Sequence, residues 1–277
     1  MMHALDPAVH GPIFATIVDL LPERPPHPLG CHRRRTPDQV CFAGILYRLV
    51  TGASWETIEA IIGYQVSDTT LRTRRDEWIT AGIFDELARQ AIAGYDRLIG
   101  LDLDHVAIDG SDHLAPCGGE GAGHSFKHPG RLSWKWCLAV DADGIPIAWT
   151  IDAGNRNDYA MFFPVLDQLA NRGLAAHIGT LHADRGFNYT STPARVTAYG
   201  IDNFAAPPRQ QRSHGTVPLV GLGQRWIVES ANSWLRNYGQ LRRNTDRKPQ
   251  HRHAALCLAI TLLITHRLRN PTHSPIR

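Results

Sequence analysis

The feature that most constrains the fold is a pair of apolar segments separated by a tight turn. Residues 134–141 and 145–152 either alternate apolar with polar side chains or run apolar throughout, and Asp143-Gly144 lies between them. An Asp-Gly pair between two such segments is a strong hairpin signal, because both residues accept the positive φ angles that tight hairpin turns require. The sequence therefore predicts an antiparallel pair of strands in the middle of the chain.

Similar short apolar runs lie on both sides of this hairpin. They predict further strands at residues 106–108, 178–183 and 201–205. Apolar side chains at helical spacing predict helices at residues 158–171 and 193–199, and more helices after residue 225. Three strands, a helix, a strand, a helix, a strand and two closing helices are the element order of a ribonuclease H-like layer. The predicted fold class is α/β (α+β), with a mixed sheet flanked by helices.

Before residue 99 the sequence carries only helical signals. Ser54 and Ser67 each stand where a helix cap is expected, and Gly63 lies in the turn between the two helices that these caps begin. A short helix, a Gly-containing turn and a basic helix predict a helix-turn-helix-like, DNA-binding unit within an all-α domain at residues 36–98. Many helical bundles share this pattern without touching DNA, so a purely structural bundle is the alternative.

The remaining domain limits follow from composition. Residues 1–35 contain several prolines and a basic cluster at 32–35, so we expect a loosely ordered lead-in. Residues 99–277 contain all the predicted strands and form the second domain, which ends in basic helices. From Arg225 onward there are ten Lys or Arg residues and two Asp or Glu residues, whereas the whole chain has a net charge of +3. This basic end suits a polyanion such as nucleic acid, although a solvated helical face would look the same.

Three carboxylates stand at positions that suggest chemistry. Asp109 and Asp184 each follow an apolar run that reads as a buried strand, and Glu229 lies on the polar side of a helix at residues 225–236. Taken alone, Glu229 fits an ordinary amphipathic helix with a solvated face. If the three converge, their mutual repulsion requires divalent cations between them, and carboxylate oxygens favour Mg²⁺ or Mn²⁺. Two such ions about 3.5–4 Å apart would suit cleavage of a phosphodiester.

Arginines beside these carboxylates and on the predicted basic helix are candidate phosphate contacts. They are Arg72, Arg74, Arg75, Arg185, Arg225 and Arg236. Asp112 is a candidate supporting group for Asp109. His251 and His253 flank Arg252, and we interpret them as structural or DNA-facing residues rather than metal ligands.

Cysteine content and hydropathy bear on the compartment. The five cysteines are scattered and form no C-x-x-C pair, which argues against a disulfide framework and against a zinc site, and favours a reducing cytoplasm. No signal-peptide pattern is present at the N-terminus. The longest apolar run, residues 254–265, is shorter than the ~20 residues that span a bilayer, so we expect a core helix there and no membrane association.

Several short motifs occur in a fixed order within residues 33–268. They are Ile108-Asp109-Gly110-Ser111, Asp141–Pro146, Gly154–Asp158, His182–Phe187, Arg225–Glu229, Trp234-Leu235 and Leu241-Arg242-Arg243. Each is weak alone, but in this order they resemble the bacterial transposases of insertion sequence family 5, in the DDE superfamily. The segment from Arg35 to Phe84 resembles the helical domain that precedes the catalytic core in that family.

This resemblance implies a function and a set of roles. Asp109, Asp184 and Glu229 would be the DDE triad that holds two Mg²⁺ or Mn²⁺ ions, and Arg242 and Arg243 would contact double-stranded DNA. The enzyme would hydrolyse the element's ends at terminal inverted repeats, and the freed 3′-hydroxyl would then attack target DNA. Two ends must be held together, so a homodimer or higher oligomer is expected, at the bacterial nucleoid.

Two departures and two alternatives accompany the resemblance. Leu222 and Ser230 stand where related signatures have Tyr and Arg. One alternative is a transposase-derived protein that binds DNA without cutting it, and the presence of all three carboxylates argues against it. The other is a ribonuclease H-like nuclease or resolvase unrelated to transposition, and the helix-turn-helix pattern argues against that one.

Overall fold

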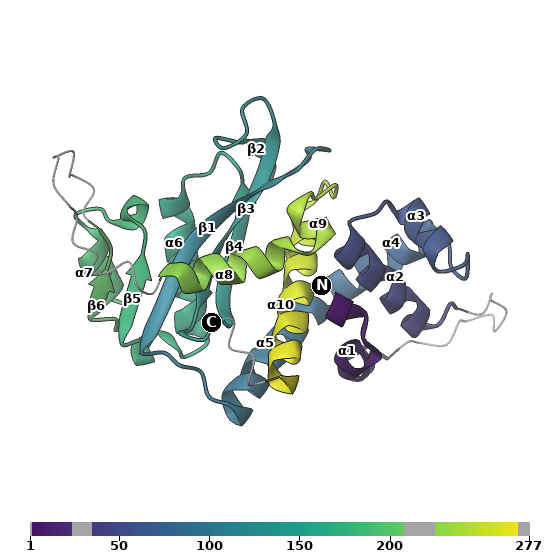
Figure 1. Cartoon of the computed structure of the whole chain (residues 1–277), viewed down its shortest axis with the longest axis horizontal. Coiled ribbons are helices and arrows are strands. Elements are labelled where there is room, and N and C mark those ends of the chain that lie inside the picture. Colours follow the sequence, from purple (N-terminus) through teal and green to yellow (C-terminus); the bar gives the residue numbers. More distant parts are fainter. Residues whose placement is uncertain (1, 24–34, 208–224, 271–277) are drawn as a thin grey trace.

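The computed structural model describes residues 2–23, 35–207 and 225–270, and a six-stranded mixed sheet forms one half of the molecule, with a bundle of helices on the other side (Figure 1). The strands are β1 (His105–Leu114), β2 (Gly123–His124), β3 (Leu132–Val140), β4 (Pro146–Ala153), β5 (Thr180–Ala183) and β6 (Asn203–Ala205). β3 is antiparallel to β1, β2 and β4, whereas β5 is parallel to both β1 and β6. The strands therefore lie in the order β4, β3, β1, β5, β6, with the two-residue β2 also paired to β3, and the predicted ribonuclease H-like mixed sheet is confirmed.

The predicted hairpin joins β3 to β4, and its turn is built around a buried carboxylate. Asp141 Oδ1 accepts the backbone N–H groups of Asp143 at 3.1 Å and Ile145 at 2.8 Å, and Gly144 has the positive φ of +78° that the turn needs. Asp141 is fully buried, and its Oδ2 has no hydrogen-bond partner. Burial raises the pKa of Asp141 to about 7.

Helices cover both faces of the sheet. α6 (Asp158–Asn171), which matches the predicted helix, packs on β3 and β4, and α7 (Thr192–Thr197) lies beside β6. α8 (Arg225–Arg236) crosses β1 and β3 on the other face, and α9 (Gly239–Arg242) follows it. Single-turn 3₁₀ helices η2 (Ala175–His177) and η3 (Arg185–Phe187) flank β5.

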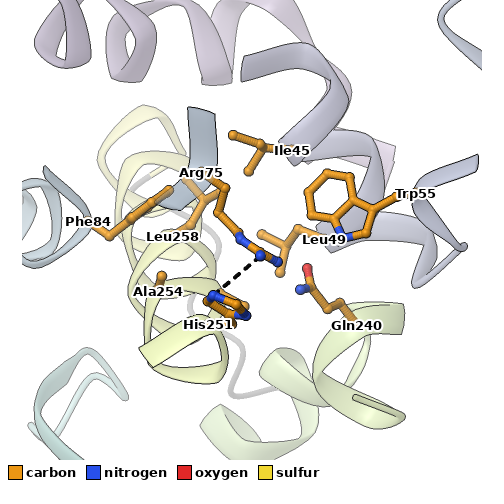
Figure 2. Close-up of a pocket in the computed structure, with 10 residues that line it drawn as sticks. Ile45, Leu49, Trp55, Arg75, Phe84, Gln240, His251, Ala254 and Leu258 are labelled. Carbon is orange, nitrogen blue, oxygen red and sulfur yellow. Dashed lines mark hydrogen bonds between the residues drawn. The ribbon is translucent and has the colours of Figure 1, made fainter. Parts of the chain in front are cut away.

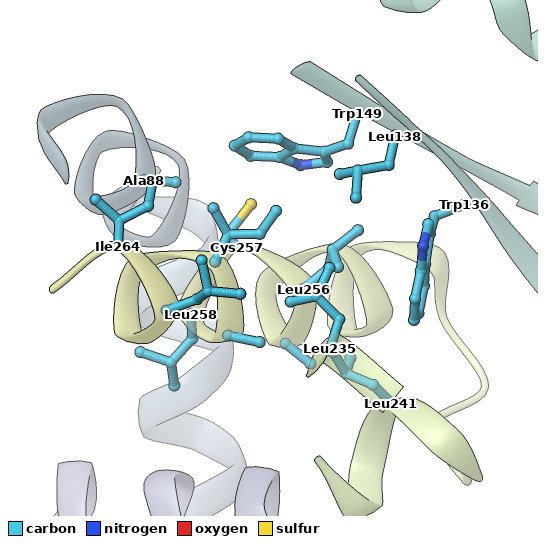
Figure 3. Packing of buried hydrophobic residues seen from close by; sticks show 14 of the residues in the cluster. Ala88, Trp136, Leu138, Trp149, Leu235, Leu241, Leu256, Cys257, Leu258 and Ile264 are labelled. Carbon is cyan, nitrogen blue, oxygen red and sulfur yellow. The ribbon is translucent and has the colours of Figure 1, made fainter. Parts of the chain in front are cut away.

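α10 (Pro249–Arg269) is the long helix that joins the two halves of the molecule. It packs on β4 on one side and along α5 (Ile83–Leu98) on the other. Figure 3 shows Leu256 and Cys257 of α10 beside Trp136, Leu138 and Trp149 of the sheet. Within the described ranges, no helix is both long and apolar enough to cross a membrane.

The N-terminal helices form a bundle beside α10. They are η1 (Met2–Leu5), α1 (Pro7–Leu20), α2 (Asp38–Thr51), α3 (Trp55–Ile61), α4 (Asp68–Thr80) and α5. Ser54 and Ser67 cap α3 and α4 by accepting the N–H groups three residues ahead, as predicted. α3 and α4 pack together with a six-residue turn between them, which is the expected helix-turn-helix-like arrangement.

The loosely ordered lead-in predicted for residues 1–35 is wrong for its first part. Residues 7–20 form α1, which Asp6 caps through the N–H of Ala8 and which packs on α5 and α10. Val9, Ile13 and Ile17 recur at helical spacing and are buried, so tertiary burial stabilises a segment whose prolines suggested a loop. Residues 24–34, with most of the basic cluster at 32–35, lie outside the described residues.

A buried ionic cluster holds the bundle against the C-terminal helices. Asp246, in the segment between α9 and α10, lies 3.1 Å from Arg48 of α2 and 3.2 Å from Arg75 of α4, and all three are at most 7% exposed. Burial acts to raise the pKa of Asp246, but Arg48 and Arg75 hold it below its usual value. Gln240 donates a further hydrogen bond at 2.7 Å.

Figure 2 shows the small cavity beside this cluster, between α2, α3, α4 and α10. Arg75 and His251 meet across it at 3.3 Å. Its volume of about 10 Å³ has room for about one water molecule, so this cavity is a packing feature and not a substrate pocket.

We expect Asp246→Ala to lower the free energy of unfolding by about 3–5 kcal/mol, because it leaves Arg48 and Arg75 charged, buried and without their shared anion. Urea denaturation followed by circular dichroism measures this change. Asp202→Ala, at an exposed position, is the control and should cost well under 1 kcal/mol. A loss at Asp246 no larger than at Asp202 would contradict the assigned role.

Asp141→Asn should change how stability depends on pH. The folded-state pKa of Asp141 is raised to about 7 from an ordinary 3.8, so ionisation of the wild-type carboxyl costs stability as the pH rises through that window. The variant lacks this penalty. Its stability relative to wild type should therefore rise by about 2–4 kcal/mol between about pH 4 and about pH 8. Equal pH profiles for the two proteins would show that burial does not shift this group.

Candidate active site

The two predicted aspartates lie on adjacent strands at the same level. β1 and β5 are parallel, with Ile108 opposite Ala183, so Asp109 and Asp184 are the next residues along each strand direction. Asp109 is half-buried in the middle of β1, and Asp184 is half-buried just beyond the end of β5. Asp184 Oδ1 accepts the backbone N–H of Arg185 at 2.6 Å, which fixes the carboxylate at the start of η3.

Strand alternation shows on which face of the sheet the side chain of Asp109 lies. Asp109 is directly opposite Leu138 of β3, and directly opposed residues of an antiparallel pair point to the same face. Leu138 and Trp136 face α8 and α10 in Figure 3. The neighbouring residue, Gly110, faces the other way, since a Cβ there would lie 3.1 Å from Asp158 of α6. Asp109 is therefore on the face that α8 covers.

One buried hydrogen bond sets the position of α8 on that face. Trp136 Nε1 donates to Asn232 Oδ1 at 2.7 Å, and both residues are at most 5% exposed. Asn232 lies three residues after Glu229, on the predicted polar side of the helix, and no local signal identifies this docking contact because its partner is 96 residues away. Further along α8, Arg236 donates to the carbonyl of Asp112 at 3.4 Å.

These two contacts hold the C-terminal half of α8 where the helix crosses β1 and β3. Glu229 is exposed and precedes Asn232 by three residues, so it lies about one helical turn from the buried docking contact. Glu229 therefore belongs to the helix that covers the face of Asp109.

The three carboxylates do not form a compact cluster. Within the described residues, one set of three potential ligands lies within 4.8 Å of one another, and it is a different set, Asp85, His253 and Cys257. A two-ion site differs from such a cluster, because residues that hold different ions need not be neighbours. Three hard carboxylate donors on one sheet face, in side chains that are exposed or half-buried, fit Mg²⁺ or Mn²⁺ in ligand type and in access.

The predicted arginines fall into three groups. Arg185, Arg236, Arg242 and Arg243 are exposed, and the last three lie along α8 and α9 near the end of β1. Arg72 is also exposed, on α4, with an ion pair to Asp68 at 2.9 Å. Arg225 begins α8, and the structure describes its backbone alone; Leu222 lies outside the described residues.

The expectation that Arg74 and Arg75 contact DNA phosphates is wrong. Both are less than 10% exposed. Arg74 pairs with Asp38 of α2 and with Glu77, and Arg75 pairs with Asp76 and Asp246. These arginines hold α4 against its neighbours, so Arg72 is the member of the predicted trio that is open to solvent.

Asp112 has a structural role close to the site. It is buried and alternates to the face opposite Asp109, where its Oδ2 accepts the hydroxyl of Ser125 at 2.6 Å. This bond holds the loop between β1 and β3. The sequence suggested that Asp112 supports Asp109. The structure shows that Asp112 does not do so directly.

Comparison with known proteins identifies the family. Residues 100–264, more than half of the chain, match the family described as "Transposase DDE domain", and residues 12–88 match "Putative transposase of IS4/5 family". The matched region contains β1, β5 and α8 with all three carboxylates. The chain belongs to the DDE transposase family.

The chain is also similar to individual proteins. The chain is 30% identical over 150 residues to "Putative transposase for insertion sequence element IS402" of Burkholderia cepacia, covering 52% of this chain and 68% of the relative. It is 29% identical over 125 residues to an uncharacterized 16.2 kDa protein of the same insertion element, covering 43% and 81%. Among solved structures, a Mos1 transposase paired-end complex matches with a TM-score of 0.33 and 9% identity, over 89% of this chain and 80% of that one.

Proposed function

We propose that this transposase cuts DNA at terminal inverted repeats and joins the freed 3′-hydroxyl to target DNA. The observation that carries the proposal is the parallel register of β1 and β5, which sets Asp109 and Asp184 level on the face that α8 covers. Family membership supports the same chemistry. Glu229 would complete the set, because the Asn232 and Arg236 contacts hold α8, which carries it, across the strand of Asp109.

Asp109, Asp184 and Glu229 would hold two divalent ions, Mg²⁺ or Mn²⁺. Such ions, when bound, activate the attacking oxygen, stabilise the leaving oxygen and neutralise phosphate charge. The protein contributes rigidity. Asp109 sits within a central strand, the N–H of Arg185 orients Asp184, and the buried bond of Asn232 fixes the helix that carries Glu229.

Exposed arginines beside these carboxylates would position the DNA backbone. Arg185 follows Asp184, and Arg236, Arg242 and Arg243 continue from the end of α8 along α9. Guanidinium groups bind phosphate oxygens through charge-assisted hydrogen bonds, which fix the register of a duplex without reading its sequence. Arg72 on the helix-turn-helix-like unit would add a contact from the bundle. Two transposon ends must be held together, so the working form would be a homodimer or a higher oligomer.

Asp109→Asn, Asp184→Asn and Glu229→Gln should each reduce cleavage by on the order of 100-fold or more while leaving DNA binding near wild type, because each removes charge where phosphate and metal meet. The assay is nicking of a labelled duplex that contains the DNA flanking the gene, with Mg²⁺ or Mn²⁺. The matched control is Asp158→Asn, whose carboxylate lies beside Gly110 on the opposite face of the sheet. Cleavage retained by a triad variant would refute its role, and binding without cutting by the wild type would identify a protein that has lost the reaction.

Arg72→Ala and Arg74→Ala should have different effects: the first on the affinity for DNA, and the second on the stability of the fold. Loss of exposed Arg72 should weaken duplex binding and lower the dependence of log affinity on log salt by about one charge, with little change in stability. Loss of buried Arg74 should instead lower the free energy of unfolding by about 3 kcal/mol, because it removes the buried guanidinium that pairs with Asp38. Titrations at two salt concentrations and urea denaturation measure both effects. The reverse pattern would place Arg74 in the DNA interface.

A further inference from the structure

A second set of metal-ligating side chains lies away from the three catalytic carboxylates, where α5 packs along α10. Asp85 is in the first turn of α5, and His253 and Cys257 are one helical turn apart on α10. Their ligand atoms surround one point. Asp85 Oδ1 is 2.6 Å from His253 Nε2, Cys257 Sγ is 3.4 Å from the same nitrogen, and Sγ is 3.9 Å from Oδ1.

These distances are close to those of a tetrahedral metal site. Metal bonds of about 2.0–2.3 Å at tetrahedral angles put neighbouring ligand atoms roughly 3.3–3.6 Å apart. The two distances to Cys257 already lie near this range. The carboxylate of Asp85 must move less than about 1 Å from His253 to admit an ion, and its side chain is free to do so because it is 64% exposed.

The types of donor atom determine which class of metal ion this site would bind. One thiolate, one imidazole and one carboxylate are the ligands of zinc and similar late transition ions, whereas Mg²⁺ takes oxygen ligands. Cys257 is fully buried, His253 is partly exposed and Asp85 is open, so the set reaches from the core to solvent and leaves an entry path. His and Cys four residues apart on a helix lie on the same face. The sequence contains this spacing, but zinc sites were predicted only from C-x-x-C pairs, so the spacing was overlooked.

Charge near the set is also compatible with a dication. Arg172 is the cation that faces Cys257 and Asp85 from the edge of the sheet, and its own contacts are the ring of Trp149 and the carbonyl of Ile147. A dication bound by one thiolate and one carboxylate is neutral overall. Arg172 therefore does not oppose the bound state.

We propose that Asp85, His253 and Cys257 bind a zinc-class divalent transition ion that clamps α5 of the helical bundle to α10. The fourth position is open to water on the solvent side of Asp85. The clamp is independent of the catalytic carboxylates and of the DNA reaction. Its effect is to hold the bundle to the helix that packs on the sheet.

The test is a Co²⁺ titration of the full-length, reduced, metal-stripped protein. Cobalt bound to a thiolate gives a near-ultraviolet charge-transfer band that carboxylates of the catalytic face cannot produce. We expect this band at one equivalent, its displacement by Zn²⁺ but not by Mg²⁺, and its loss in Cys257→Ser. Asp85→Asn, at an exposed position that spares the fold, should weaken Co²⁺ binding by at least the 10- to 100-fold typical of lost support at metal sites.

Two matched variants make the result specific. Asp76→Asn disturbs a similar pair that lacks a thiol, in which His251 of α10 lies 3.0 Å from Asp76 of α4. Cys117→Ser removes the cysteine that is exposed among the described residues. Both should bind Co²⁺ as the wild type does, and Zn²⁺ should raise the melting temperature of both. Absence of the band at saturating Co²⁺, or its survival in Cys257→Ser or undiminished affinity in Asp85→Asn, would overturn the proposal and leave an ordinary His253–Asp85 ion pair.

Discussion

Parallel pairing of β1 with β5 is the constraint on which the candidate active site depends. The two strands are separated by the β3–β4 hairpin and α6, yet their register sets Ile108 opposite Ala183. Each strand is followed at that level by an aspartate, and alternation sends neighbouring residues of paired strands to the same face. A slip of one residue in this register would turn one carboxylate away from α8.

The third carboxylate depends on a different kind of interaction, a buried polar contact between a helix and a sheet. α8 could slide along an apolar surface at little cost, but the bond from Trp136 to Asn232 has one position. Displacing it would leave a buried indole N–H without an acceptor, which costs about 1–3 kcal/mol. The hydrogen bond thus contributes more to the specificity of docking than to net stability. Because Glu229 lies about one turn before Asn232 on the same helix, its position is fixed by the same bond.

Features with local causes were predictable, and features with distant partners were not. The Asp143-Gly144 hairpin, the helix at 158–171 and the Ser54 and Ser67 caps depend on residues a few positions apart, and all are present. α1 was missed because its stability comes from Val9, Ile13 and Ile17 packing on helices remote in sequence. The burial of Arg74 and Arg75 depends on Asp38 and Asp246, 36 and 171 residues away, so their sequence position on a basic helix was misleading. The family was found because the order of several weak motifs carries information that the spacing within each motif lacks, whereas the roles of the three carboxylates stay predictions.

Polar contacts at the start of α10 couple the bundle to the sheet face that carries the candidate site. Asp246 precedes α10 and binds two arginines of the bundle, and His251 and His253 on its first turns meet Asp76 of α4 and Asp85 of α5. The opposite side of α10 packs on β4 and contacts α8. A rigid shift of α4 against the sheet would therefore have to separate a buried ion pair, which costs several kcal/mol. A duplex bound at the bundle, as proposed, would accordingly be held in a fixed position relative to the carboxylates on β1, β5 and α8.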